Sequence, residues 1–332
     1  MNTAVKNSVP QSASPPAKRF LFPARETTCK ITLIDDPMPT TFENLEIPGK
    51  VLFSEGNGML LKLEIKTAWS RAEVYLHGAH VTHFQINGQA PLLFMSQLSR
   101  FDEGAPIRGG IPVIFPWFGA REGEPAHGFA RTQLWEMREI SPLSDGGLSV
   151  RLRLPDSPAA ALFPKFSAEY LVTVGQNLTA ELVVTNESQD EDFTFENCLH
   201  TYFHVGDISA VSVTGLKGAD YLDKVDGFAR KTERSEHIKF SRETDSVYLN
   251  TPNAVEIHDS KLQRRIRIEK SGSLSTVVWN PWVDKAQQMP DFGNDEYRQM
   301  VCVESGNVAE NKITLPAGKT SSLKAVISPL PL

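Results

Sequence analysis

The stretch GMLLKLEIKTAWSRAEVYLHGAHVTHFQING (58–88) carries the pattern that decides the fold. Apolar and polar residues alternate over Gly58–Thr67, over Ala72–Leu76 and, after a turn, over Val81–Ile86. Successive side chains of a β-strand point to opposite faces, so this alternation predicts strands with one buried face. The Asn87-Gly88 pair that follows is a strong hairpin signal. The stretch therefore predicts a series of antiparallel strands.

The rest of the chain repeats this pattern of strands separated by turn residues. Further strands are predicted at 148–154, 166–174, 178–186, 193–202, 210–215, 255–259, 264–270, 275–279, 299–304, 313–315 and 319–327. No segment shows the apolar spacing of an amphipathic helix of about 12 residues. This absence excludes alternating βαβ units. The predicted fold class is all-β, in a large and mainly antiparallel arrangement.

The distribution of residue types predicts one large domain behind a short tail. Residues 1–25 are rich in serine, proline, alanine and asparagine, and we interpret them as a flexible N-terminal tail. A short strand is expected at Cys29–Ile34. The chain has 332 residues, of which 40% are apolar, enough for a sizeable core. No linker splits the middle of the chain, so we expect residues 26–332 to form a single β-sandwich domain.

Charge and cysteine content narrow the range of partners and cellular settings. The net charge is −6, which argues against nucleic acid or an anionic membrane as the main partner. Three cysteines in a chain of this length do not suggest a disulfide scaffold. No apolar run reaches the roughly 18 residues needed to span a bilayer, and the N-terminus lacks the pattern of a secretory signal. We therefore expect a protein of the reducing cytoplasm.

A second stretch, GAPIRGGIPVIFPWFGAREGEPAHGFAR (104–131), is a candidate ligand-binding segment. Its glycines allow close backbone approach, while its prolines disfavour both a long helix and a central strand. We predict an ordered, apolar-lined loop that presents Arg108 and Arg131. Guanidinium groups suit phosphate or carboxylate ligands. Pairing of both arginines with structural carboxylates is an equally weighted alternative.

Two predicted strands carry polar residues that could perform acid–base chemistry. They are FENCLHTYFH (195–204) and VCVESGN (301–307). Strand alternation places Glu196, Cys198 and His200 on one face, and it places Cys302 and Glu304 on one face. A histidine titrates near neutrality and a glutamate can act as its partner, so His200 and Glu304 are acid–base candidates. Structural hydrogen bonding is the simpler interpretation of such a pair.

Other polar groups allow weaker functional interpretations. Asp245 could accept sugar hydroxyls or cap a turn, and the Trp279–Trp282 segment could stack on a sugar or pack a sandwich edge. The lysines and arginines at 217, 224, 230–234 and 261–267 are interpreted as solvated surface. Two metal sites are considered and disfavoured, one formed by His77, His80 and His83 and one formed by His127, His200, His204 and Glu304. Phosphate-cradling, dinucleotide-binding and nucleophile-elbow motifs are absent from the sequence.

Taken together, four motifs resemble one family, the glucose-6-phosphate 1-epimerases. The motifs are RGGIPVIFPWFG (108–119), AHGFAR (126–131), LHTYF (199–203) and VCVE (301–304). YLDKV (221–225) and TDSVYLN (244–250) are similar to the same family, and the resemblance runs from about residue 40 to the end. This family is the hexose-6-phosphate branch of the aldose 1-epimerases, also called galactose mutarotases. The resemblance implies a β-supersandwich with a cleft on one broad face, and it implies no metal and no cofactor.

The resemblance also implies a role for individual residues. His200 would be the general acid and Glu304 the general base. Arg108 and Arg131 would bind the phosphate and the sugar. Asp245 and His127 would also contact the substrate: Asp245 would bind the sugar, and His127 would support the ring oxygen. The expected partner is a small-molecule sugar phosphate, and the expected oligomeric state is a monomer.

The sequence departs from the family in two places, and it leaves two alternative functions open. Ala126 stands where some members have glutamine, and His204 replaces the more usual asparagine or arginine. One alternative is a mutarotase of unphosphorylated hexoses, against which the arginine motifs weigh. The other is a non-catalytic sugar-phosphate-binding domain, against which His200 and Glu304 weigh. Only the fold can bring these two residues together, because 104 positions separate them (304 − 200).

Overall fold

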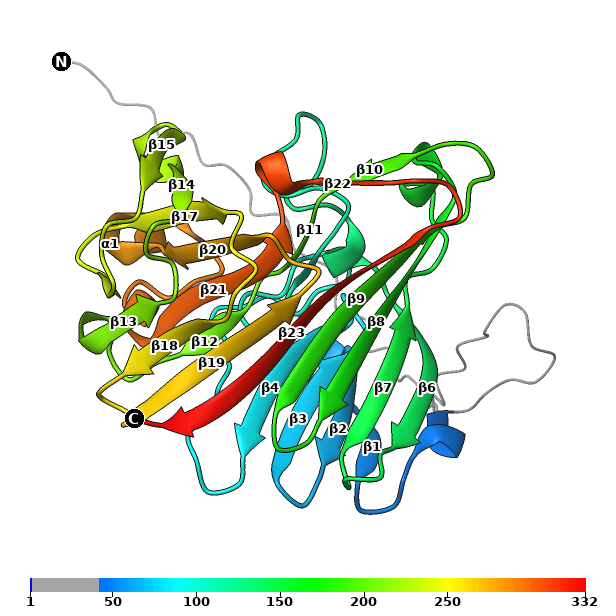
Figure 1. Cartoon of the computed structure of the whole chain (residues 1–332). Coiled ribbons are helices and arrows are strands. Elements are labelled where there is room, and N and C mark those ends of the chain that lie inside the picture. The colour runs from blue at the N-terminus through cyan, green and yellow to red at the C-terminus, as the bar shows by residue number, and fades with distance from the viewer. Residues whose placement is uncertain (2–41) are drawn as a thin grey trace. The chain divides into compact units, whose positions relative to one another are not determined.

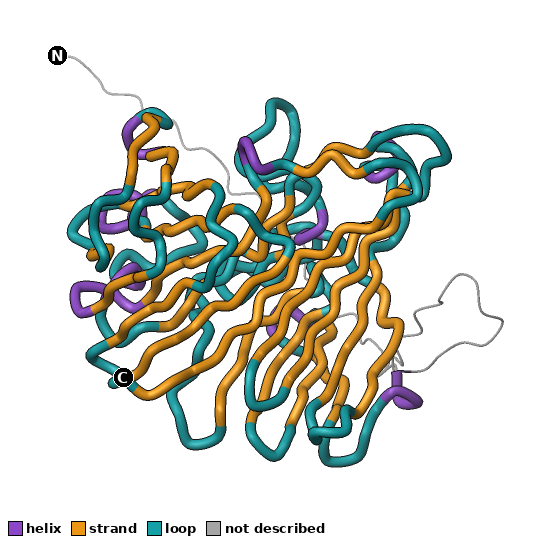
Figure 2. Tube along the Cα trace, in the orientation of Figure 1, coloured by secondary structure: helices purple, strands orange, loops and turns teal. Residues whose placement is uncertain are grey.

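The computed structural model describes residue 1 and residues 42–332, so the predicted strand at Cys29–Ile34 and the predicted tail boundary lie outside the described residues. Residues Phe42–Leu332 form one compact unit. Strands dominate this unit, which confirms the all-β, antiparallel prediction (Figure 2). Within the described part of the chain, no helix is long and apolar enough to cross a membrane.

Three large sheets and one small sheet contain the strands, and every pairing between them is antiparallel. The four-stranded sheet contains, in order, β1 (Val51–Glu55), β2 (Leu61–Lys66), β3 (Ser70–Tyr75) and β4 (His80–Ile86). The nine-stranded sheet contains, in order, β16 (Ile238–Lys239), β13 (Val211–Thr214), β18 (Val255–Asp259), β19 (Arg264–Ser271), β23 (Thr320–Pro331), β9 (Leu178–Asn186), β8 (Phe166–Val174), β7 (Leu148–Arg153) and β6 (Glu136–Pro142) (Figure 1).

The eight-stranded sheet holds the residues of greatest functional interest. It contains, in order, β15 (Ala229–Thr232), β14 (Asp220–Asp223), β17 (Thr244–Leu249), β20 (Ser275–Asn280), β21 (Met300–Asn307), β11 (Asn197–Leu199) and β5 (Val113–Ile114), with β12 (Tyr202–His204) also paired to β21. A small sheet pairs β10 (Phe193–Phe195) with β22 (Ile313–Leu315).

Helical segments are short and connect strands. The single α-helix among the described residues is α1 (Trp282–Gln288). The 3₁₀ turns are η1 (Phe42–Leu45), η2 (Asn57–Met59), η3 (Ala130–Thr132), η4 (Ala160–Leu162), η5 (Ile208–Ala210), η6 (Lys224–Asp226), η7 (Glu296–Gln299) and η8 (Ala309–Asn311).

A continuous apolar core holds the large sheets together. In β8 and β9 every second side chain is buried, as the alternating sequence predicts, and the bounds of both strands match the prediction to the residue. The same core cluster contains Val74 of β3, Tyr170 of β8 and Val303 of β21. Removing this much apolar surface from water is the main force that stabilises the sandwich.

The strand predicted at 193–202 is divided into three pieces in the structure. Its first part, β10, pairs with β22, whereas β11 and β12 both pair with β21. The first break falls at Glu196, whose carboxylate accepts hydrogen bonds from the backbone N–H groups of Phe118 and Ala309. The second break falls at His200 and Thr201. A single alternating strand was therefore the wrong description, because the chain changes its pairing partner twice.

The 104–131 stretch connects the four-stranded sheet to the eight-stranded sheet. Ile111 donates a backbone hydrogen bond to Val81 of β4, while His200 donates to Pro112 and Tyr202 donates to Gly110. At Gly110, which has φ +60°, an added Cβ would lie 2.3 Å from the Val81 oxygen, so a side chain would push the segments apart. The predicted ordered loop is confirmed, with β5 as its regular part.

Candidate active site

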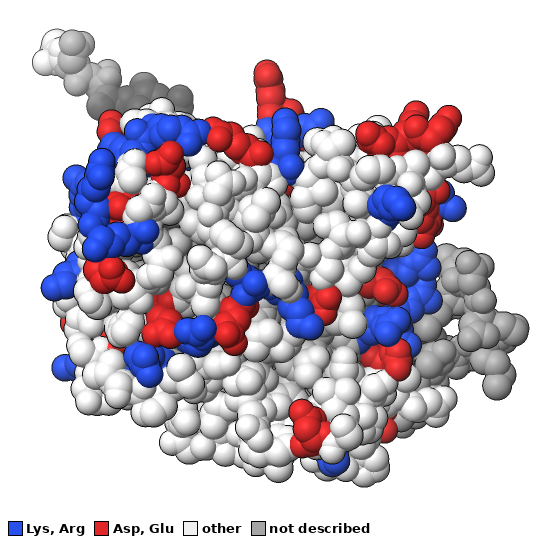
Figure 3. Space-filling view, in the orientation of Figure 1, with Lys and Arg blue, Asp and Glu red and all other residues white. Residues whose placement is uncertain are grey.

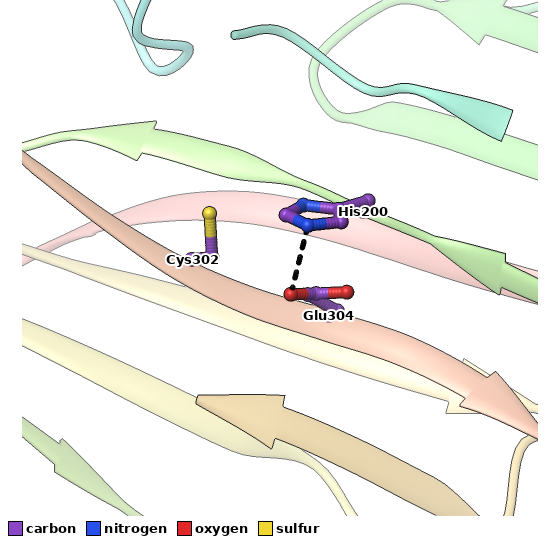
Figure 4. A group of neighbouring side chains, drawn as sticks. All are labelled: His200, Cys302 and Glu304. Carbon is purple, nitrogen blue, oxygen red and sulfur yellow. Dashed lines mark ion pairs between the residues drawn. The ribbon is translucent and has the colours of Figure 1, made fainter. Parts of the chain in front are cut away.

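His200 and Glu304 lie side by side in the structure although 104 positions separate them in the sequence. Leu199 at the end of β11 pairs with Ser305 of β21, so His200, which follows β11, lies next to Glu304, which precedes Ser305. The His200 Nε2 atom lies 3.3 Å from the Glu304 Oε1 atom (Figure 4). The register of two antiparallel strands therefore brings the two acid–base candidates together.

A cavity of about 290 Å³ opens over this pair. Its size suits a small molecule rather than a polymer. The lining residues come from the 104–131 stretch, the eight-stranded sheet, η6 and the α1 region. They are Arg108, Phe118, His127, His200, Tyr202, Lys224, Asp245, Val277, Trp279, Lys285, Met289 and Glu304.

Burial favours the uncharged forms of both His200 and Glu304. The two residues are 8% and 1% exposed, respectively. Burial lowers the pKa of His200 well below its ordinary value, and His127, Arg108 and Arg131 add to this effect. Burial raises the pKa of the Glu304 carboxyl well above its ordinary value. In the uncharged pair a single proton resides on Glu304, and its transfer to His200 would produce an ion pair.

His127 is held as a neutral hydrogen-bond donor at the cavity wall. Its Nδ1 accepts a hydrogen bond from the backbone N–H of Gly119 at 3.2 Å, so the ring proton is on Nε2. Burial lowers the pKa of His127 to about 3, and the positive charges of Arg131, Lys224 and Arg108 contribute. The residue has φ 67°, a left-handed conformation that costs energy outside glycine.

The two predicted arginines differ in their relation to the cavity. Arg108 lines the cavity, donates to the Tyr202 hydroxyl at 2.8 Å and forms an ion pair with Asp291 at 3.1 Å. The alternative prediction, that the arginines pair with structural carboxylates, is therefore confirmed for Arg108. Arg131 does not line the cavity, and it donates to the Ala126 carbonyl at 2.7 Å.

Arg131 nevertheless lies close enough to influence the site. Among the described residues it forms no ion pair, and its buried Nε atom has no hydrogen-bond partner. Burial lowers the pKa of Arg131 to about 10, and the neighbouring charge of Arg108 acts in the same direction. Its position next to the 126–128 backbone makes it a support for His127 as well as a source of positive charge.

The interpretation of Lys224 as solvated surface was wrong. Its Nζ lies 2.7 Å from the Asp245 Oδ2 atom and 5.5 Å from the centre of the Phe118 ring, inside the cavity wall. Burial raises the pKa of the Asp245 carboxyl, and the charge of Lys224 opposes the shift. Lys285 of α1 also lines the cavity and was not predicted. Lys224 belongs to the YLDKV motif, which was the available signal, whereas nothing in the spacing pointed to Lys285.

The remaining candidates divide between cavity wall and core. Trp279 lines the cavity with its ring perpendicular to those of His200 and Tyr202, whereas Trp282 packs against Tyr297 outside it. Neither His204 nor the histidines at 77, 80 and 83 line the cavity. A larger hollow of about 820 Å³ lies along β14, β15 and β17, but it does not contain the His200–Glu304 pair.

The charges around the cavity favour an anionic ligand. Arg108, Lys224 and Lys285 line it, and Arg131 lies nearby. In the described part of the chain, His200, Cys302 and Glu304 form the one group whose nitrogen, sulfur and oxygen atoms converge within 4.8 Å. The surrounding positive charges oppose the approach of a divalent cation to this group. Elsewhere acidic and basic side chains are interspersed, as the face in Figure 3 shows.

A histidine and a glutamate that face a small polar cavity are the residue types that general acid–base catalysis uses. Residues 61–328 match the aldose 1-epimerase family, and the chain belongs to this family.

Curated relatives support the assignment over most of the chain. A relative from Cenchrus ciliaris is 35% identical over 271 residues, covering 78% of this chain and 82% of its own length. A relative from Escherichia coli K12 is 36% identical over 245 residues, which cover 73% of this chain and 81% of the relative. Both carry the provisional name glucose-6-phosphate 1-epimerase. A solved structure described provisionally as a mutarotase from Salmonella typhimurium has a TM-score of 0.79 at 29% identity, covering 86% of this chain and 96% of its own.

Proposed function

We propose that this protein interconverts the α and β anomers of D-glucose 6-phosphate and related hexose 6-phosphates. The observation that carries the proposal is one cavity that combines the His200–Glu304 pair with Arg108, Lys224 and Lys285. The pair supplies the proton transfers of ring opening, and the cations suit the phosphate. The provisional name of the relatives supports the same substrate.

The reaction requires one proton to leave the sugar and another to reach it. Glu304 as carboxylate would take the proton of the anomeric hydroxyl, while His200 as imidazolium would protonate the ring oxygen as the C1–O5 bond breaks. The open aldehyde rotates about the C1–C2 bond and closes on its other face with the two roles reversed. Protons balance because each group gives or receives one in each half of the cycle.

Burial of the pair would assist the ring-opening step. The reactive form is the ion pair, a minority form that arises when the Glu304 proton moves to His200, and after ring opening both groups are neutral. A site that raises the pKa of Glu304 and lowers the pKa of His200 favours the neutral products of this transfer. Well-placed acid and base groups contribute roughly 10²–10⁴-fold each.

The other polar residues would hold the sugar in register. The neutral Nε2–H of His127 would donate to the ring oxygen region, and Asp245 would accept a sugar hydroxyl. Arg108 and Arg131 were predicted to bind phosphate and sugar. Because Arg131 is not among the residues that line the cavity, we assign direct phosphate contact to Arg108 and the two lysines and assign support of the His127 segment to Arg131.

Anomer exchange measured by NMR tests the proposal. Exchange of glucose 6-phosphate should exceed the spontaneous rate and should be accelerated far more than exchange of glucose or galactose. Equal acceleration of the free sugars would instead identify a mutarotase of unphosphorylated hexoses. Binding without acceleration would identify a non-catalytic sugar-phosphate-binding domain. The monomeric state and the cytoplasmic location stay predictions, which sedimentation and fluorescence localisation would check.

A further inference from the structure

Glu304 has a second contact that the proposed proton transfers do not use. The Cys198 thiol donates a hydrogen bond to the Glu304 Oε2 atom at 3.3 Å. The other carboxyl oxygen, Oε1, faces His200 Nε2 at the same distance. The carboxyl is therefore held on one side by the thiol and on the other by the imidazole. Both Cys198 and Glu304 are buried, at 0% and 1% exposure.

The strand register explains how the thiol reaches this carboxyl. Cys198 of β11 pairs directly with Gly306 of β21, and Glu304 lies two residues from Gly306 on the same face of β21. Diagonal neighbours of this kind are within reach of a side chain.

The absence of a side chain at Gly306 leaves room for the Cys198 thiol. A Cβ added at Gly306 would lie 2.9 Å from the Cys198 Sγ atom and 2.8 Å from the Asn197 carbonyl oxygen. The glycine therefore leaves the space through which the thiol extends toward Glu304.

We propose that Cys198 is a positioning residue, whose thiol fixes the Glu304 carboxyl so that Oε1 faces His200 and the cavity. The inference rests on the proposed role of Glu304 as the base. A fixed carboxyl loses less freedom when it meets the anomeric hydroxyl, which makes the reactive geometry easier to reach. The thiol is a weak donor, but a donor to the carboxylate stabilises that form over the protonated one.

Several other charged or titratable groups face Glu304 and Cys198, and the test must separate them from the thiol. They are His200 beside β11, Cys302 of β21, Asp245 of β17, Lys224 of η6 and Lys270 of β19. None of these changes when Cys198 is substituted. Cys302 supplies a matched control because it is buried, lies on the same strand as Glu304 and makes no hydrogen bond to the Glu304 carboxyl.

The experiment compares Cys198→Ala, Cys198→Ser and Cys302→Ala in the full chain. Cys198→Ala removes the donor, so kcat for glucose 6-phosphate should fall roughly three- to tenfold with little change in KM. Because Glu304 has the higher pKa of the pair, the alkaline limb of the kcat/KM profile should move to higher pH by about half a unit to one unit. Cys198→Ser keeps a donor and should restore most of the rate and the limb. Cys302→Ala should leave the alkaline limb in place.

Infrared spectroscopy supplies a readout that does not depend on activity. In a background with both Cys29→Ala and Cys302→Ala, the S–H stretching band should show a hydrogen-bonded Cys198 thiol that becomes free in Glu304→Ala. An active wild type whose alkaline limb is unmoved by Cys198→Ala, or a Cys198→Ser variant as impaired as Cys198→Ala, would overturn the inference alone. A wild type that fails to accelerate anomer exchange would overturn the proposed function and the role of Cys198 in it.

Discussion

At the scale of single residues, the site is a set of polar side chains whose protonation is controlled by burial. Glu304 lies on β21, a strand that is buried over its whole length, Met300–Asn307. A carboxyl in such a place is costly unless it is neutral, paired or functional. Its contacts with His200 and Cys198 satisfy both oxygens. Asn307 on the same strand is also hydrogen-bonded: its Oδ1 accepts from the Leu274 N–H, and its Nδ2 donates to Asn197 Oδ1. The buried side chains of Glu304 and Asn307 therefore both have hydrogen-bond partners.

Removal of either member of the acid–base pair should abolish most of the rate. Glu304→Gln keeps the size of the side chain but cannot take a proton, so we expect kcat to fall roughly 10²–10⁴-fold. His200→Gln should fall within the same range. Anomer exchange by NMR measures the rate, and thermal unfolding confirms that the variants are folded. Glu269→Gln, at an exposed position on β19, is the control. A Glu304→Gln variant with near-normal kcat would exclude Glu304 as the base.

Lys285 should discriminate phosphorylated from free sugars. It lines the cavity, and among the described residues its amine forms no ion pair. Its charge is therefore available to a phosphate, and Lys285→Ala should raise KM for glucose 6-phosphate by roughly three- to tenfold while leaving free-sugar binding unchanged. Initial rates with both substrates measure the effect. Lys217→Ala, which removes an exposed lysine paired with Glu236, is the control. An equal loss for glucose would show that Lys285 does not contact the phosphate.

At the scale of elements, the 104–131 stretch is built around tight backbone approaches. The backbone N–H groups of Phe129 and Ala130 both donate to the Phe115 carbonyl. Gly128 permits this because a Cβ there would lie 2.0 Å from that same oxygen. The neighbouring His127 is hydrogen-bonded to Gly119, so the position of this proposed substrate contact depends on a glycine.

Substitution of Gly128 should therefore destabilise the protein more than substitution of Gly123. Both glycines have positive φ, +70° and +74°, but an added Cβ at Gly123 has nothing within 4 Å. Gly123→Ala should cost about 1 kcal/mol from conformation alone, whereas Gly128→Ala should cost about 3 kcal/mol or more because backbone must move. Urea unfolding of both variants measures the difference. Equal losses would show that the contact with Phe115 is relaxed at no cost.

At the scale of the whole molecule, burial couples protonation to stability. The pKa of His127 is about 3 in the folded chain, against an ordinary value of 6.5. Below pH 6.5 the unfolded chain binds a proton that the native protein does not, so His127 lowers stability as the pH falls from 6.5 toward 3. Glu304 acts in the opposite direction because its pKa is raised, so the total slope mixes several groups.

The contribution of His127 can be isolated by comparing the free energy of unfolding of the wild type with that of His127→Gln at each pH. His127→Gln keeps a polar side chain and removes the titration, so the wild type should lose stability relative to this variant by about 1 kcal/mol per pH unit between pH 6 and pH 4. Urea unfolding at several pH values measures the difference. His237→Gln, at an exposed position, should track the wild type. A constant offset between His127→Gln and wild type over this range would show that His127 protonates in the native state.

The sequence predicted most accurately the strands whose bounds depend on local alternation of apolar and polar residues. Strand alternation located β8 and β9 to the residue, because each of these strands has one face in the core and keeps one pairing register. Strands of two to seven residues were missed because only the packed sheet stabilises them, and they are β1, β5, β6, β14, β15, β16 and β17. The strand predicted at 193–202 was divided because partner exchange is set by tertiary contacts.

The sequence by itself determined the all-β class, the resemblance to its family and the identities of His200 and Glu304 as a candidate pair. Only the tertiary structure decided that the two side chains lie 3.3 Å apart, that Lys224 and Lys285 line the same cavity and that Arg131 does not line it. The physical reason is that alternation acts over a few residues, whereas the meeting of β11 with β21 depends on the register of strands far apart in the chain. The hydrogen bond from Cys198 to Glu304 arises from that same register.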